Sequence, residues 1–311
     1  MAEQFGLVFP GQGSQVTGML ADLATEYPVV QETFSQASTV LGYDLWEVVQ
    51  SNPDGKLNQT EFTQPALLAA SVAIYRCFAD AIGTPAMLAG HSLGEYSALV
   101  CAGALEFTDA IQLVQLRGQA MQQAVPEGTG AMAAVIGLAD DAIAQACEQA
   151  EQGEIVAPVN YNSPGQVVIA GHKDAVARAG EACKAAGAKR VLPLPVSVPS
   201  HCALMRPAAD VLSSALQQIN IATPGIPVLH NVDVTRAAAS SIADKLVAQL
   251  HSPVRWTETM QAFADQGIYR IYEIGPGKVL TGLSKRIDKA LETSAVNDAA
   301  SVLNIIEEQA K

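Results

Sequence analysis

A serine lies between two glycines in the segment AMLAGHSLGEYSALVCAGAL, residues 86 to 105. A short apolar run precedes the pattern Gly90-x-Ser92-x-Gly94, and residues with helical spacing follow it. This order predicts a sharp strand-to-helix turn, which would lift the hydroxyl of Ser92 clear of the backbone. The glycines would leave room for neighbouring chain. The alternative is an ordinary turn, because glycine and serine are common turn residues. Ser92 is therefore a candidate nucleophile.

A nucleophilic serine at a helix start would have donors for an oxyanion beside it. Backbone N–H groups there point toward the attacked carbonyl, and the helix dipole favours negative charge. We expect the amide of Leu93 to be one donor and the loop PGQGSQ, residues 10 to 15, to supply a second. The competing interpretation of that loop is a dinucleotide-binding fingerprint. Val16 stands where the fingerprint requires its third glycine, which disfavours that alternative.

Serine needs a base that accepts its proton. The chain has five histidines: His91, His172, His201, His230 and His251. We expect the side chain of His91 to diverge from Ser92, because the two are adjacent. His201 follows the proline-rich segment LPLPVSVPS and is held in a stiff loop. Spacing alone does not select among the histidines.

One arginine interrupts an apolar helical stripe. At 100° per residue, six apolar residues lie within 60° of Arg117, while glutamines occupy the opposite face. The apolar residues are Ala110, Leu113, Val114, Ala120, Met121 and Ala124. A buried guanidinium needs a partner. That partner is either a carboxylate of the protein or a carboxylate of a substrate held by the planar fork.

The elements that must position these residues alternate between strand and helix. Strands are expected at residues 4–9 and 86–90, and helices at 28–41, 65–82 and 108–124, the last with Thr108 as N-cap. Such alternation predicts an α/β fold with a mostly parallel sheet.

The order of predicted strands and helices changes in the middle of the chain. Residues 128–197 read as strand, helix, strand, strand, helix, strand, the order of a ferredoxin-like unit. We therefore predict a small ferredoxin-like subdomain at 128–197, inserted into a large subdomain formed by 1–127 and 198–311.

Composition narrows the function classes. The 311 residues are 49% hydrophobic and carry a net charge of −13, which disfavours broad nucleic-acid binding. We predict neither a membrane span nor a signal peptide, and the five scattered cysteines predict a cytoplasmic protein without a metal cluster. Basic residues gather in two groups: Lys184, Lys189 and Arg190, and Lys278, Lys285, Arg286 and Lys289. Each is either a solvated surface or a patch for an anionic partner.

The motifs together resemble a known family. VFPGQGSQ, GHSLGEYSAL, the arginine 25 residues after the serine, NYNSPGQVVIAG, VSVPSH and EIGPGKVLTGL are similar to motifs of the malonyl-CoA:acyl carrier protein transacylases of bacterial fatty-acid synthesis. The similarity covers about residues 4 to 295. It implies an α/β-hydrolase-like core with a ferredoxin-like insertion, which agrees with the predicted elements.

The resemblance also implies roles for individual residues. Ser92 would be the nucleophile, His201 the general base, and Arg117 the residue that holds the malonyl carboxylate. The amides of Gln12 and Leu93 would form the oxyanion hole.

Further family positions complete the expected site. The main-chain carbonyl of Gln249 would orient the histidine, in place of the usual triad acid. Asn160 and Asn162 would lie near the pantetheine arm. Met121 and Ser200 are expected to line the substrate site, although many malonyl-selective polyketide acyltransferases carry an aromatic residue at the second position.

The implied chemistry is ping-pong transfer from malonyl-CoA to holo-acyl carrier protein, with no metal or other cofactor, by a cytoplasmic monomer. The carrier protein would dock on Lys189, Arg190, Lys285 and Arg286. A thioesterase is the enzymatic alternative, but it would leave Arg117 without a purpose and would favour an acidic residue behind the histidine. A scaffold that has lost catalysis would be expected to lack Ser92, His201 or Arg117.

Overall fold

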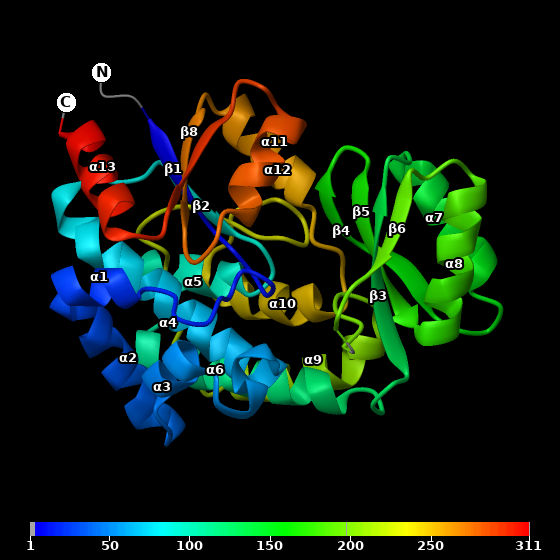
Figure 1. The fold of residues 1–311 in the computed structure, drawn as a ribbon, viewed down its shortest axis with the longest axis horizontal. Coiled ribbons are helices and arrows are strands. Elements are labelled where there is room, and N and C mark those ends of the chain that lie inside the picture. The colour runs from blue at the N-terminus through cyan, green and yellow to red at the C-terminus, as the bar shows by residue number, and fades with distance from the viewer. Residues whose placement is uncertain (1–3, 197, 311) are drawn as a thin grey trace.

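The computed structural model describes residues 4–196 and 198–310. Its larger sheet has five parallel strands in the order β7-β2-β1-β8-β9 (Figure 1). The strands are β1 Phe5–Phe9, β2 Met87–Gly90, β7 Val228–Leu229, β8 Arg270–Ile274 and β9 Glu292–Val296. The parallel pairing confirms the fold class predicted from the alternation of strands and helices.

Helices cover both faces of this sheet. They are α1 Ala21–Glu26, α2 Pro28–Leu41, α3 Leu45–Ser51, α4 Thr60–Phe78, α5 Gly94–Cys101, α6 Phe107–Gln123, α9 Arg206–Leu216, α10 Ala239–Leu250, α11 Trp256–Asp265, α12 Val279–Ile287 and α13 Ala299–Gln309. Short 3₁₀ helices span Pro53–Asn58, Ala79–Ala81 and Ala203–Met205. Side chains of β1 alternate between the two apolar cores, with Leu7 and Phe9 in one and Val8 in the other. A strand buried on both faces is typical of a parallel sheet.

Two predicted helix details are wrong. Thr108 is not an N-cap, because α6 already begins at Phe107 and its N-cap residue is Glu106. Helix α4 begins at Thr60, five residues earlier than expected, and accommodates Pro65 in its interior. Most of α4 is buried, so tertiary packing outweighs the tendency of proline to end a helix.

The smaller sheet has four antiparallel strands in the order β4-β5-β3-β6. They are β3 Gly130–Ile136, β4 Val156–Ser163, β5 Gln166–His172 and β6 Arg190–Pro193, with helices α7 Asp140–Ala150 and α8 Lys173–Ala185 on one face (Figure 1). The element order confirms the ferredoxin-like prediction. The proposed boundaries at 127/128 and 197/198 stay a prediction, and residue 197 lies outside the described residues.

The two parts of the molecule meet along β4. The backbone N–H of Tyr161 donates to the carbonyl of Val254 at 3.0 Å, and the N–H of Val254 donates to Val159 at 2.8 Å. The hydroxyl of Thr257 donates to the carbonyl of Tyr161. These contacts fix the edge of the small sheet against the segment that leads into α11, next to the predicted site residues of β4.

The glycines on either side of Ser92 are required by close backbone packing. A Cβ on Gly90 would lie 1.9 Å from the carbonyl carbon of Gly94, and a Cβ on Gly94 would lie 2.1 Å from the carbonyl oxygen of Phe9. Helix α5 therefore approaches the ends of β1 and β2 more closely than a side chain at Gly90 or Gly94 would permit.

We predict that Gly94→Ala lowers the free energy of unfolding by at least about 1–3 kcal/mol, because backbone must move to admit the methyl group. The matched control is Gly282→Ala in α12, where a Cβ meets nothing within 4 Å. That change should be neutral or stabilising, because alanine favours a helix interior. Urea denaturation of both variants measures the difference, and equal stabilities would contradict the packing argument.

Candidate active site

A pocket of about 120 Å³ brings together residues from both parts of the molecule. Eight of the residues predicted for the substrate site line it: Gln12, Ser92, Leu93, Arg117, Met121, Asn160, Ser200 and His201. The side of the pocket formed by the small subdomain includes Met132 and Leu194. Gln249 and Asn162 lie behind this lining and contact residues that form it.

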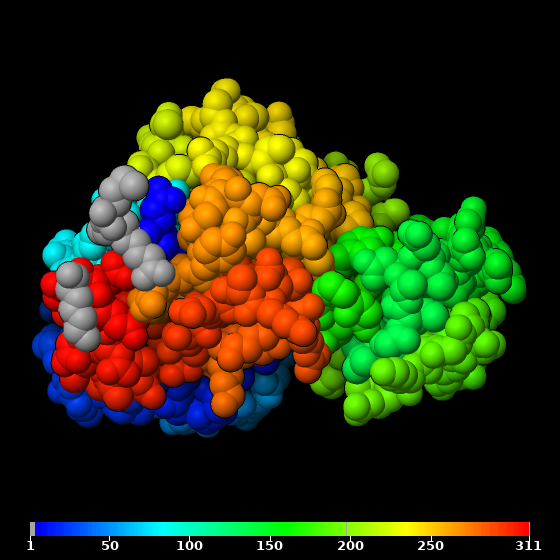
Figure 2. Space-filling view, turned by 90° about the horizontal axis from the view of Figure 1, so that it is seen from above, coloured from blue at the N-terminus to red at the C-terminus, as the bar shows by residue number. Residues whose placement is uncertain are grey.

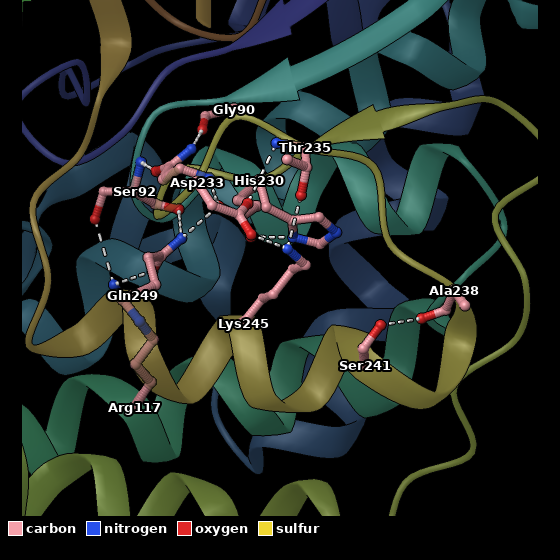
Figure 3. Close-up of polar contacts among 12 residues, drawn as sticks. Gly90, Ser92, Arg117, His230, Asp233, Thr235, Ala238, Ser241, Lys245 and Gln249 are labelled. Atoms are coloured by element: carbon pink, nitrogen blue, oxygen red, sulfur yellow. Dashed lines mark hydrogen bonds and ion pairs between the residues drawn. The ribbon is translucent and has the colours of Figure 1, made fainter. Parts of the chain in front are cut away.

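Ser92 lies at a strained turn between β2 and α5. Its φ angle is 52°, a left-handed conformation that is uncommon for residues other than glycine. Asn231 holds the turn from both sides: its Oδ1 accepts a hydrogen bond from the N–H of Ser92 at 2.7 Å, and its Nδ2 donates to the carbonyl of Gly90 at 2.7 Å (Figure 3). The hydroxyl of Ser92 is therefore fixed at the pocket.

His201 is the histidine that contacts this hydroxyl. Its Nε2 lies 2.8 Å from Oγ of Ser92, and its Nδ1 lies 2.7 Å from the main-chain carbonyl oxygen of Gln249. A carbonyl oxygen only accepts, so Nδ1 carries the proton of the neutral ring. Nε2 is then free to accept the proton of Ser92. The backbone carbonyl thus fixes the tautomer that a general base requires.

Burial keeps His201 neutral. Desolvation, reinforced by the positive charge of Arg117, lowers the pKa of His201 from 6.5 to about 3. The hydrogen bond that Nδ1 donates to the main-chain carbonyl of Gln249 raises the pKa but does not outweigh burial. At neutral pH the ring is therefore an unprotonated acceptor. The pKa of the buried His91 is also lowered, again chiefly by desolvation.

Two backbone amides at the pocket are available to a ligand. Within residues 4–196 and 198–310, neither the N–H of Gln12 nor that of Leu93 has an acceptor. Both residues line the pocket beside Ser92. Paired backbone donors of this kind stabilise the oxyanion of an acyl-transfer intermediate.

Arg117 is 1% exposed and has no ionic partner among the described carboxylates. Its Nη1 donates to Oε1 of Gln64 at 2.8 Å, and its Nη2 donates to Oε1 of Gln249 at 3.0 Å. Nη2 also lies 3.3 Å from Oγ of Ser92, and the guanidinium carbon is 5.4 Å from the centre of the Tyr96 ring. Burial lowers the pKa of Arg117. Of the two partners considered from the sequence, a protein carboxylate does not contact this cation within the part of the chain that the structure describes.

A buried carboxylate lies on the far side of Gln249. Glu95 is 0% exposed and accepts hydrogen bonds from Nε2 of Gln249 at 2.9 Å and from the N–H of Asn231 at 2.9 Å. Its other oxygen lies 2.7 Å from Nδ1 of His230. Gln249 also donates to the carbonyl of Ser92 at 3.0 Å, and Figure 3 shows this amide between Ser92 and Arg117.

Sequence reasoning missed this second group of residues: Gln64, Glu95, His230, Asn231 and the side chain of Gln249. The expectation that Gln249 acts only through its main chain is incomplete, because its amide contacts Arg117, Ser92 and Glu95. A signal did exist for Gln64, which is a polar residue that precedes the apolar run ALLAASVAI. No comparable pattern marks Glu95 or Asn231.

The two asparagines of β4 have different surroundings. Oδ1 of Asn162 lies 2.8 Å from Nε2 of His91, so the side chain of His91 turns away from Ser92, as expected from their adjacency. Asn160 lines the pocket, and its buried Oδ1 has no hydrogen-bond partner among the described residues. An unpartnered amide oxygen at the pocket wall suits an N–H donor of a ligand. No group of three or more His, Cys, Asp or Glu residues in the described chain is arranged to hold a metal ion.

The four predicted docking residues are exposed and lie near one end of the small sheet. Nη1 of Arg286 donates to Oε1 of Gln166 at 2.7 Å, and Gln166, Ile136 and Arg190 are paired across neighbouring strands. In Figure 2 the orange residues around α12 lie against the green small subdomain. The pocket residue Met132 is at the other end of β3, four residues from Ile136, so the basic residues do not line the pocket.

A parallel sheet, a strained serine turn and a histidine held by a carbonyl define a serine acyl-transfer enzyme. The family model for the acyl transferase domain matches residues 7–310. The malonyl CoA-acyl carrier protein transacylase of Escherichia coli K12 is 61% identical over 306 residues, which cover 98% of this chain and 99% of that protein. The chain belongs to the malonyl CoA-acyl carrier protein transacylase family.

Solved structures agree with this assignment. An acyl carrier protein S-malonyltransferase from Vibrio cholerae superimposes with a TM-score of 0.96 at 64% identity and covers 97% of this chain and 100% of its own. A malonyl-transacylase in complex with a type II polyketide acyl-carrier protein gives a TM-score of 0.97 at 60% identity, covering 98% and 99%. No helix in the described ranges is long and apolar enough to span a membrane.

The lowered pKa of His201 predicts an acylation rate that persists well below pH 6.5. Replacing Arg117 with glutamine removes one cause of that lowering, so the pKa of His201 should rise while burial keeps it below 6.5. The acid limb of the rate profile should therefore move to higher pH. Single-turnover acylation by acetyl-CoA measures it without the complication of a substrate carboxylate.

The control is to measure, at each pH of the rate profile, whether the protein is still folded. The unfolded chain protonates His201 near 6.5 and the folded chain only near 3, so stability falls as pH drops between these values. Circular dichroism defines the usable range. An acid limb that stays in place, or moves to lower pH, in Arg117→Gln would contradict the electrostatic account.

Proposed function

We propose that this enzyme transfers a malonyl group from CoA to the phosphopantetheine thiol of holo-acyl carrier protein through an ester on Ser92. The observation that carries the proposal is Arg117, a buried cation that has no ionic partner among the described residues and whose Nη2 lies 3.3 Å from the Ser92 hydroxyl. An acyl group bound to that hydroxyl and ending in a carboxylate would supply the missing partner. The names of the Escherichia coli and Vibrio cholerae relatives agree with malonyl as that group.

The first half-reaction loads the enzyme. Nε2 of His201 accepts the proton of Ser92 as Oγ bonds to the thioester carbonyl carbon, and the amides of Gln12 and Leu93 stabilise the oxyanion. The tetrahedral intermediate collapses with cleavage of the carbon–sulfur bond. The CoA thiolate leaves and takes the proton from His201. The products are CoA and malonyl-Ser92.

The second half-reaction reverses these roles. His201 accepts the proton of the phosphopantetheine thiol, and the sulfur attacks the carbonyl carbon of the ester. Collapse of the second intermediate returns the proton to Oγ of Ser92. The same two amides bind both oxyanions, so one site serves both steps.

Transfer suits this site better than hydrolysis. A triad hydrolase orients its histidine with a carboxylate, whereas His201 contacts a main-chain carbonyl. A thioesterase would also leave the partnerless Arg117 unexplained. A scaffold without catalysis is disfavoured by the hydrogen bond of 2.8 Å between Ser92 and His201.

We propose that the reaction needs no cofactor, because a serine, a histidine and backbone amides supply the nucleophile, the base and the oxyanion donors. One chain contributes all of them, which favours a monomer. We also propose a cytoplasmic location, which the five free cysteines support.

The malonyl ester is expected to persist until a thiol arrives. Malonyl-CoA alone should add one malonyl group to the wild-type protein, observed by intact mass spectrometry. Ser92→Ala should show no adduct, because the bonding oxygen is gone. His201→Ala should load far more slowly, since general-base catalysis contributes roughly 10²–10⁴-fold. An adduct that persists in Ser92→Ala would rule out this nucleophile.

We propose that the carrier protein docks on the surface formed by Lys189, Arg190, Lys285 and Arg286. The proposal is supported by their exposure, by the contact of Arg286 with Gln166, and by the strand register that places Gln166 and Arg190 on either side of Ile136. From Ile136 to Met132 the distance along β3 is roughly 13 Å. The extended phosphopantetheine arm would span this separation, with Asn160 and Asn162 near its path.

Charge reversal tests the docking surface. Lys285→Glu/Arg286→Glu should slow transfer to the carrier protein, most strongly at low salt, and spare acylation by malonyl-CoA. The control Lys56→Glu/Arg236→Glu makes the same change of charge elsewhere and should affect neither step. Equal losses in both half-reactions would place the defect in the enzyme's fold and not in docking.

A further inference from the structure

Neutral amides surround the buried cation of the site. Both terminal nitrogens of Arg117 donate to glutamine oxygens, one from Gln64 on α4 and one from Gln249 on α10. Both glutamines are 0% exposed. Side-chain amides orient a guanidinium by hydrogen bonding and leave its charge unneutralised.

The protein does contain a buried anion nearby, but the amide of Gln249 separates it from the cation. Glu95 contacts Nε2 of Gln249, while Arg117 contacts Oε1 of the same amide. The carboxylate of Glu95 is occupied by donors from Asn231 and His230. The fold therefore places one amide group between opposite charges that would otherwise pair directly.

We propose that Gln64 is a specificity-determining residue, because its neutrality keeps the charge of Arg117 available for a carboxylate on the acyl group. This inference rests on the proposed function, in which Arg117 binds the malonyl carboxylate. A glutamate at position 64 has the same shape but would form an internal ion pair with Arg117. The enzyme would then favour acyl groups without a carboxylate.

Gln64 tests this idea more cleanly than Gln249 does. Gln249 also contacts the Ser92 carbonyl and Glu95, and its main chain orients His201. The only other side-chain partner of Gln64 in the described chain is Sδ of Met121, at 3.5 Å from Nε2. A substitution at position 64 thus changes the surroundings of Arg117 and leaves the serine–histidine pair in place.

The experiment compares acylation by malonyl-CoA and by acetyl-CoA in single turnover, followed by intact mass spectrometry near pH 7.5. In Gln64→Glu, the preference for malonyl should fall by about a hundredfold, because the substrate carboxylate now competes with an internal one. Acetyl loading should stay within a few-fold of wild type. Gln64→Met removes the amide without adding charge and should keep most of the preference.

The matched control is Gln112→Glu, the same substitution at an exposed position of α6, the helix that carries Arg117. It should leave both rates unchanged. Thermal melting of each variant separates loss of folding from loss of specificity.

If the Gln64→Glu variant keeps the wild-type preference for malonyl over acetyl, the role of Gln64 is overturned but the proposed function is not. The role of Gln64 is also overturned if Gln64→Met loses the preference as fully as Gln64→Glu. The hydrogen bond of the amide, and not its neutrality, would then determine the preference. If Gln64→Glu does not fold, Gln64→Met still decides: retained preference supports the inference and lost preference contradicts it. A wild-type enzyme that does not prefer malonyl to acetyl would overturn the proposed function itself.

Discussion

The site depends on one constraint, a buried guanidinium that no carboxylate of residues 4–196 and 198–310 contacts. Such a charge is costly to desolvate, so every contact around Arg117 must offset part of that cost. Oxygens of Gln64 and Gln249 accept from it, and the ring of Tyr96 lies beneath it. These residues come from α4, α10 and α5, so three helices must converge on a fourth. In the proposed function, the desolvation cost that remains favours a substrate that carries a carboxylate.

Gln249 contacts both Arg117, the proposed binding residue, and the two residues proposed for catalysis, Ser92 and His201. Its main-chain carbonyl sets the tautomer of His201, while its side chain contacts Arg117 and the carbonyl of Ser92. Nucleophile, base and binding residue therefore share one partner near the end of α10. Glu95 contacts the amide of Gln249 and, with Asn231, supports the serine turn from behind. A small shift of α10 would disturb all three functions together.

The parts of this site that depend on local order could be predicted from the sequence. The serine turn and the lone charge on the α6 stripe each follow from a pattern within about 20 residues, and the parallel sheet follows from the alternation of strands and helices along the chain. The choice of His201 from five histidines and the carbonyl of Gln249 came only from family resemblance, because the contact of His201 with Ser92 joins residues 109 apart in sequence and that of Gln249 with His201 joins residues 48 apart. The buried polar residues Gln64, Glu95 and Asn231 were missed for the same reason. Helix boundaries failed at Thr108, where α6 begins one residue earlier, and at Pro65, where burial of most of α4 outweighs local preference.

The central claim is that Arg117 recognises a carboxylate on the acyl group. The most direct test is the rate of acyl-enzyme formation in Arg117→Ala with malonyl-CoA and with acetyl-CoA, measured on the same folded protein. The account predicts that malonyl loading collapses by about a hundredfold or more, while acetyl loading changes little or increases, because an uncharged group then meets an apolar pocket. A fall by the same factor for both thioesters would mean that Arg117 only supports the fold, and would contradict the account.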